Sequence, residues 1–201
     1  MIDPYPATFS VDYPDRFLDK LTTFFRLFVA VPILVVVATV GGGSSDNGRN
    51  AAAGGLLVAG PLLMILFRRK YPRWWFDWNL ELSRFAFRVA AYLALMDDRY
   101  PATDDQQSVH LGLLYPDASR LNRWLPLVKW FLAIPHFVAL VFLGIAAFFA
   151  TIVAWLSILF TGRYPRAIFT FNEGVMRWGL RVTAYALVLS TDRYPPFRLS
   201  P

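Results

Sequence analysis

Long apolar stretches alternate along the chain with short clusters of basic, aromatic and proline residues. Residues 27–40, 51–67 and 130–160 are apolar almost throughout. Two further segments, about 74–96 and 167–189, mix apolar residues with arginines at helical spacing, which predicts amphipathic helices. The pattern predicts an all-α integral membrane protein.

The two amphipathic segments carry the same constellation. Each holds two arginines and a tyrosine placed four residues apart, so the three side chains share one face of a helix. These candidate positions are Arg84, Arg88, Tyr92, Arg177, Arg181 and Tyr185.

The similarity extends over most of the chain. Tyr13-Pro-Asp returns at Tyr115, and Asp98-Arg-Tyr-Pro returns at Asp192. We interpret residues 1–105 and 106–201 as two tandem parallel repeats. The first is expected to hold a short transmembrane hairpin at about 16–68 and its amphipathic helix at about 74–96. The second is expected to hold a hairpin at about 119–161 and its helix at about 167–189.

The hairpin in the second repeat is inferred from length. As one straight helix, residues 130–160 would measure about 46 Å, against a bilayer core of roughly 30 Å. The first repeat carries a glycine-rich polar segment, residues 41–50, at the equivalent place, and this segment is interpreted as a linker loop. We therefore expect a turn near Gly144. The alternative is a re-entrant pair of arms that does not span.

The amphipathic helices are predicted to lie in the membrane interface. Asp77, Glu81, Arg84 and Arg88 form a polar stripe, and each charge at the bilayer centre would cost about 2.5–3.5 kcal/mol. The alternative is that these helices pack against the hairpins and that their arginines pair with acidic groups.

Composition supports a membrane protein. The chain has 201 residues, 56% of them hydrophobic, and a net charge of +6. Its basic residues flank apolar runs, which favours anionic lipid over nucleic acid as the partner. The basic cluster after residue 67 predicts a multi-pass membrane protein with both termini in the cytoplasm. The expected interface anchors are Arg68, Arg69, Lys70, Tyr71, Tyr100, Tyr164 and Tyr194.

Motifs for catalysis or metal binding are missing from the sequence. The chain has no cysteine and only two histidines, His110 and His136, which share no motif. We expect no catalytic residues, no metal and no cofactor. The paired arginines are candidates for binding a lipid headgroup or for fixing helix packing.

The second half also resembles a known family. Tyr-Pro-Arg at 164–166, Arg-x-x-x-Arg-Val-x-Ala-Tyr at 177–185 and Asp-Arg-Tyr-Pro-Pro-Phe at 192–197 are similar to domain of unknown function 4389, an uncharacterised membrane family of bacteria, mainly actinobacteria. The resemblance extends to the first half, so it suggests two tandem copies. It implies a protein of the bacterial inner (cytoplasmic) membrane and no particular activity.

Three functions follow as hypotheses. The first is a non-enzymatic accessory or scaffold subunit that associates with a larger membrane complex, or with further copies of itself, and with anionic lipids. The second is a small oligomeric transporter or lipid-handling protein with a headgroup site at the paired arginines. The third, a lipid-modifying membrane enzyme, is disfavoured because no acid–base pair or nucleophile is visible.

Overall fold

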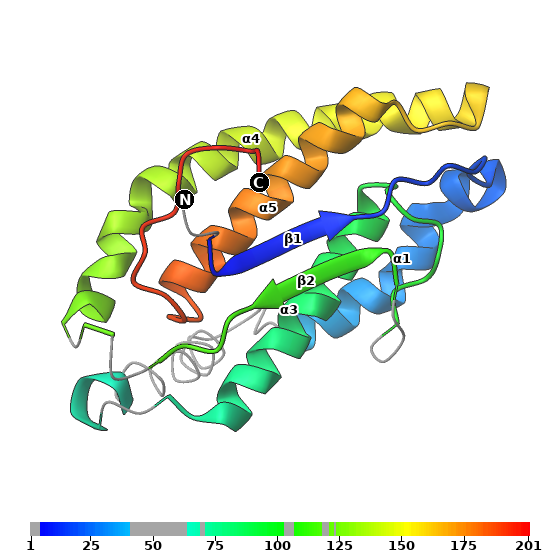
Figure 1. The fold of residues 1–201 in the computed structure, drawn as a ribbon. Coiled ribbons are helices and arrows are strands. Elements are labelled where there is room, and N and C mark those ends of the chain that lie inside the picture. The colour runs from blue at the N-terminus through cyan, green and yellow to red at the C-terminus, as the bar shows by residue number, and fades with distance from the viewer. Residues whose placement is uncertain (1–4, 41–63, 69–70, 103–106, 118–120, 123) are drawn as a thin grey trace, which may run out of the picture.

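The computed structural model describes residues 5–40, 64–68, 71–102, 107–117, 121–122 and 124–201, and it is mostly helical (Figure 1). Two short strands accompany the helices. The elements in chain order are β1 (Ala7–Val11), α1 (Lys20–Val40), a π-helical turn η1 (Met64–Arg68), α3 (Arg73–Leu93), β2 (Val109–Leu113), α4 (Leu125–Thr161) and α5 (Arg166–Ala186).

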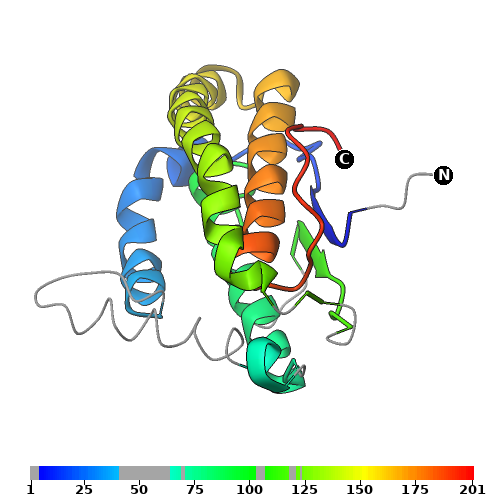
Figure 2. The same cartoon turned by 90° about the vertical axis from the view of Figure 1, so that its left-hand side faces the viewer.

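These elements form three layers. Strand β1 packs on α5 and β2 packs on α3, so the sheet covers one side of the two amphipathic helices. Helix α4 runs along α5, and α1 contacts both α4 and α3 on the side away from the sheet. Figure 2 shows this order, with the strands on one side of α5 and α1 on the other.

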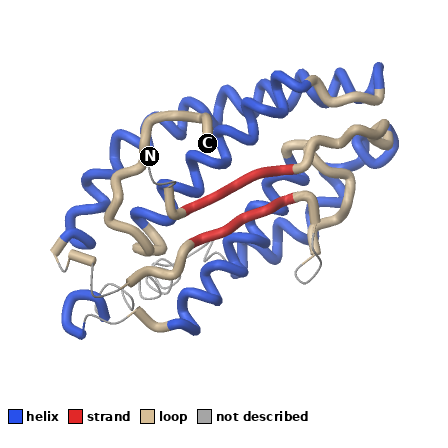
Figure 3. The backbone as a smooth tube through the Cα atoms, in the orientation of Figure 1, coloured by secondary structure: helices blue, strands red, loops and turns tan. Residues whose placement is uncertain are grey.

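The sheet corrects the all-α prediction (Figure 3). Strands β1 and β2 pair antiparallel with Phe9 opposite Leu111. Alternate residues of both strands are buried, and Thr8, Ser10 and His110 project outward. The prediction was wrong because each strand has five residues and its partner lies about 100 positions away. Neither segment presents a complete strand signal by itself.

Helix α4 contradicts the hairpin predicted at about 119–161. It is one helix of 37 residues that continues through Gly144 and ends at Gly162, whose φ of 72° forms a left-handed cap. The prediction was wrong because it assumed that these residues must fit the thickness of a bilayer. In the structure the middle of α4 packs along α5, from Ala133 beside Tyr185 to Thr151 beside Asn172. With 37 residues, α4 is longer than α5, which has 21.

The first predicted hairpin, at about 16–68, is described only in part. Helix α1 begins at Lys20 and continues through Pro32 to Val40. The segments 41–50 and 51–63, which we interpreted as a linker and part of the second arm, lie outside the described residues.

The amphipathic helices occur where they were expected, as α3 and α5. Their environment differs from the prediction, because both lie in the middle layer, between the sheet and the apolar helices α1 and α4. The alternative prediction holds only in part: the helices are packed, but Arg181 forms no ion pair with a carboxylate among the described residues. In α5 both arginines are buried, with Arg177 8% and Arg181 2% exposed.

One helix among the described residues, α4, is long and apolar enough to cross a membrane, judged by length and composition. The predicted multi-pass topology is therefore not supported.

Candidate functional site

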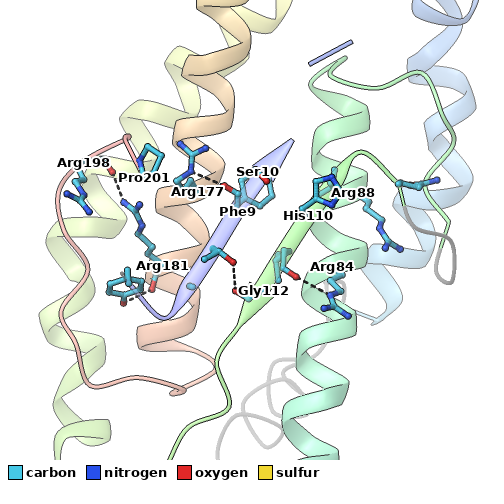
Figure 4. Close-up of a pocket in the computed structure, with 16 residues that line it drawn as sticks. Phe9, Ser10, Arg84, Arg88, His110, Gly112, Arg177, Arg181, Arg198 and Pro201 are labelled. Atoms are coloured by element: carbon cyan, nitrogen blue, oxygen red, sulfur yellow. Dashed lines mark hydrogen bonds between the residues drawn. The ribbon is translucent and has the colours of Figure 1, made fainter. Parts of the chain in front are cut away.

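A cavity of about 710 Å³ lies over the outer face of the sheet, flanked by α5 and α3 (Figure 4). Its floor includes the outward-facing residues Thr8, Ser10, His110 and Gly112. Five arginines line it, and the described lining residues include no aspartate or glutamate. The arginines are Arg84, Arg88, Arg177, Arg181 and Arg198.

The antiparallel sheet brings the arginines of the two helices together. Helix α3 carries Arg84 and Arg88 beside β2, and α5 carries Arg177 and Arg181 beside β1. The spacing of four residues keeps each pair on the side of its helix that faces the strand. All four arginines selected from the sequence therefore line one cavity.

Arg177 completes the free edge of β1. Its Nε donates to the carbonyl oxygen of Phe9 at 2.9 Å, and its Nη1 donates to that of Leu199 at 3.0 Å. Its Nη2 pairs with Glu173, whose Oε1 also accepts from the backbone N–H of Val11 at 3.4 Å. These bonds satisfy edge groups of β1 that would otherwise be unpaired.

Arg181 holds the C-terminal segment. Its Nη1 and Nη2 donate to the carbonyl oxygens of Arg198, at 3.2 Å, and Ser200, at 2.8 Å. Burial lowers the pKa of Arg181, and the charges of Arg198 and Arg177 lower it further, against a smaller opposing effect of Tyr5. Arg181 forms no ion pair with a carboxylate among the described residues, and its Nε is buried without a hydrogen-bond partner.

On the α3 side of the cavity, the arginine that bonds the strand is more exposed to solvent than Arg177 on the α5 side. Arg84 donates from Nε to the carbonyl oxygen of Leu111 at 3.2 Å and pairs through Nη1 with Glu81 at 2.6 Å. Its side chain is 36% exposed, and that of Glu81 is 59% exposed. Arg88 donates to the carbonyl oxygen of Ala102 at 2.8 Å.

Each of the two predicted tyrosines, Tyr92 and Tyr185, lies under a buried cation that was not among the predicted site residues. The guanidinium of Arg26 lies 4.5 Å from the centre of the Tyr92 ring, and the ammonium of Lys129 lies 5.1 Å from that of Tyr185. Both cations are buried. A charged residue within an apolar helical segment was the signal that could have identified them.

The same two cations pair with acids of the repeated Asp-Arg-Tyr-Pro motif. Arg26 Nη2 lies 2.5 Å from Asp98 Oδ1, and Lys129 Nζ lies 2.7 Å from Asp192 Oδ1. They also bond backbone carbonyls, Arg26 those of Tyr92 and Asp97, and Lys129 that of Thr191. These contacts tie α1 and α4 to the segments that follow α3 and α5.

The expected interface anchors have different environments. Tyr71 and Tyr164 are buried, and their hydroxyls donate to the carbonyl oxygens of Val188 at 2.6 Å and Ala94 at 3.0 Å. Tyr100 and Tyr194 are exposed, as is Arg68. Arg69 and Lys70 lie outside the described residues.

Comparison with known families gives one match. The family described as a domain of unknown function, DUF4389, matches residues 124–198. This segment is a DUF4389 domain. It contains α4, α5 and the segment up to Arg198, so the DUF4389 domain supplies three of the five arginines of the cavity, while the preceding chain supplies the sheet and α3.

The DUF4389 match occurs once, whereas the resemblance suggested two tandem copies. No curated protein and no solved structure matches the chain. Within the described residues, no group of three or more histidine, aspartate or glutamate side chains is placed to hold a metal ion.

Proposed function

We propose that this protein is a non-enzymatic membrane protein that embeds its α1/α4 layer in one face of a bilayer and holds its sheet in water, as an accessory subunit of a larger membrane complex. One observation carries the proposal: α4 packs along α5 on one side and exposes large apolar side chains on the other.

The exposed apolar surface is extensive. On α4, Phe131 is 72% exposed, Phe142 68% and Phe160 81%, and on α1 Phe28 is 74% exposed. Monomeric soluble proteins rarely expose contiguous apolar surface beyond a few hundred Å². A bilayer would cover this surface at no cost in polar desolvation, because its outward side chains are almost entirely hydrocarbon or aromatic.

The three layers favour an orientation in which α4 lies along the membrane. If α4 crossed the bilayer, α5 and the sheet would enter it too, because α5 follows α4 lengthwise and carries β1 on its other side. The exposed Ser10, His110 and Arg198 would then face hydrocarbon. Exposed polar groups and sheet edges are not tolerated there.

The absence of enzymatic activity is part of the proposal. Ser10 and His110 are cross-strand partners, and His110 Nε2 lies 3.0 Å from Asp12 Oδ2. No hydrogen bond joins Ser10 to His110. The contact between nucleophile and general base that a serine hydrolase needs is therefore missing among Ser10, His110 and Asp12. Asp12 and His110 are also more than half exposed, which leaves the pair in high dielectric.

The orientation can be tested by cysteine labelling, because the chain has no native cysteine. Trp124→Cys and Arg163→Cys place single thiols at the two ends of α4. With an impermeant maleimide, we expect both thiols to react from the same side of the membrane. Reaction from opposite sides would show that α4 crosses the bilayer and would overturn this orientation. Ser10→Cys, on the outer sheet face, reports the aqueous side.

The accessory role needs a separate test. Membranes solubilised in mild detergent should yield the protein in a native assembly of larger mass than its own detergent-bound monomer. A protein that migrates only as the monomer would argue against the accessory role and would leave the orientation unaffected.

We also infer that the chain before residue 124 contains a second, diverged copy of the same unit. The buried pairs Arg26–Asp98 and Lys129–Asp192 support this, because each lies beside a tyrosine of the following amphipathic helix. Equivalent positions should accept each other's residue. Lys129→Arg should therefore retain the folded state, whereas Lys129→Met should lose much of it. Equal loss in both variants would contradict the equivalence.

A further inference from the structure

We propose that the cavity on the outer face of the sheet binds a small phosphate-bearing anion that arrives from the aqueous side. This inference adds a ligand to the proposed function. Only its aqueous route rests on the orientation proposed above; the site itself rests on the cavity.

The cavity has the size and shape of a ligand site. Its volume of about 710 Å³ lies within the range of roughly 300–1,000 Å³ that small-molecule sites occupy. Three of the four floor residues, Thr8, Ser10 and Gly112, are small and leave space between the flanking arginines. At Gly112 a side chain would not fit, because a Cβ there would lie 2.9 Å from Oγ1 of Thr8. The two strands therefore form a shallow base with basic walls on both sides.

The charge of the walls is only partly balanced. Glu81 pairs with Arg84 and Glu173 pairs with Arg177. Arg181 and Arg198 form no ion pair within the described residues. Arg181 is 2% exposed, so its charge is held in a region of low dielectric where a counter-ion is worth more than in bulk water.

The arginines also differ in how accessible they are to a ligand. The guanidinium groups of Arg177 and Arg181 are bonded to backbone carbonyls and supply positive potential from the α5 wall, where Glu173 offsets the charge of Arg177. Arg84 and Arg198 are exposed enough to contact a ligand directly. A guanidinium fork matches phosphate oxygens in a bidentate geometry.

The position of the cavity favours a soluble source for the phosphate. The sheet and the apolar α1/α4 surface lie on opposite sides of α3 and α5 (Figure 2). A phospholipid of the bilayer that covers α1 and α4 would therefore have its headgroup on the wrong side of the molecule. The layered fold separates lipid contact from the basic cavity.

The test uses the full-length protein in nanodiscs of zwitterionic lipid. Inorganic phosphate and inorganic pyrophosphate are titrated by calorimetry, and nanodiscs that contain phosphatidylglycerol form a second arm. We expect pyrophosphate to bind. Arg198→Gln should weaken its affinity about tenfold, because one charge-assisted contact is lost. Arg166→Gln is the matched control, since Arg166 is on α5, is exposed and does not line the cavity.

A second variant separates binding from folding. Ser10→Asp adds a negative charge on the exposed floor without removing any contact of an arginine, so it should also weaken binding while the unfolding midpoint is kept. If pyrophosphate binds in zwitterionic nanodiscs but not in nanodiscs that contain phosphatidylglycerol, the lipid headgroup occupies the site, which would retain the phosphate site and overturn the aqueous source. Absence of binding in every arm, or equal affinities in Arg198→Gln and Arg166→Gln, would overturn the proposal.

Discussion

Arg177 donates a hydrogen bond of 2.9 Å from its Nε to the carbonyl oxygen of Phe9, 168 positions earlier in the chain. The bond joins α5 to the free edge of β1. Arg84 makes the corresponding bond of 3.2 Å from α3 to Leu111 on β2. The two arginines differ in burial, since the Arg177 side chain is 10% exposed and that of Arg84 is 36% exposed.

Because the two arginines differ in burial, replacing each by methionine should reduce the free energy of unfolding by different amounts. Arg177→Met leaves Glu173 and two carbonyl oxygens buried without their partner, so we expect it to reduce the free energy of unfolding by about 3–5 kcal/mol. Arg84→Met should cost roughly 1 kcal/mol, because water can solvate Glu81. Denaturant unfolding in one detergent measures both values. Equal losses would show that burial of the α5 arginine is unimportant.

Substitution by alanine should have opposite effects on stability at two glycines of α5, Gly174 and Gly179. A Cβ at Gly174 would lie 2.8 Å from Leu199 Cβ, whereas a Cβ at Gly179 would meet nothing within 4 Å. Gly174→Ala should therefore displace the C-terminal segment and free its backbone for cleavage by trypsin after Arg198, which mass spectrometry detects as loss of the last three residues. Gly179→Ala should leave cleavage unchanged and raise stability by about 0.8–1.0 kcal/mol through helix propensity. Similar cleavage in both variants would count against the packing of Leu199 on α5.

The continuity of α4 predicts that Gly144→Ala is stabilising. A Cβ at Gly144 meets nothing within 4 Å, and alanine in a helix interior is favoured over glycine by about 0.8–1.0 kcal/mol. Gly162→Ala should instead destabilise by about 1–2 kcal/mol, because Gly162 has a φ of 72° and its Cβ would lie 3.0 Å from Phe17. Thermal unfolding compares the two. Loss of stability in Gly144→Ala would restore the turn that the sequence suggested.

Buried tyrosines predict a loss of stability at high pH. Burial raises the pKa of Tyr164 to about 12, although the hydrogen bond from Asn172 opposes the shift. Burial also raises the pKa of Tyr5 and that of Tyr71. In the unfolded chain these groups lose their protons near pH 10, so between about pH 10 and 12 the unfolded state binds fewer protons and stability falls as pH rises.

Tyrosinate absorbance measures this effect. The native protein should show a fraction of its tyrosines ionising later than in denaturant, and the free energy of unfolding should decline over the same pH range. Identical titration curves for native and denatured protein would contradict the burial of these hydroxyls.

The sequence located several parts of the structure well. The arginine spacing of α3 and α5 is a local property of a helix, so the predicted segments agree with the observed helices within a few residues. Residues 130–160 are helical and expose apolar side chains, but they form one helix and not the predicted hairpin. The error was the turn near Gly144. It arose because the apolar stretch was assumed to fit the thickness of a bilayer, whereas α4 is one helix of 37 residues whose middle part packs along α5.

Other parts depended on contacts that no local pattern contains. The strands have five residues each, and β1 is complete only with β2 and with Arg177, both of which lie more than 95 positions away. For the same reason the spacing of arginines predicted their shared helix face but not that both pairs would line one cavity.

The sequence alone determined which helices are amphipathic, which are apolar, and which residues share a face, because helical periodicity and hydrophobic burial act over a few neighbouring residues. The tertiary structure decided that α4 is continuous, that two strands pair, and that Arg84 and Arg181 face one space. These features follow from packing and hydrogen bonding between segments distant in the chain, whose stabilising energy exists only once the layers have assembled.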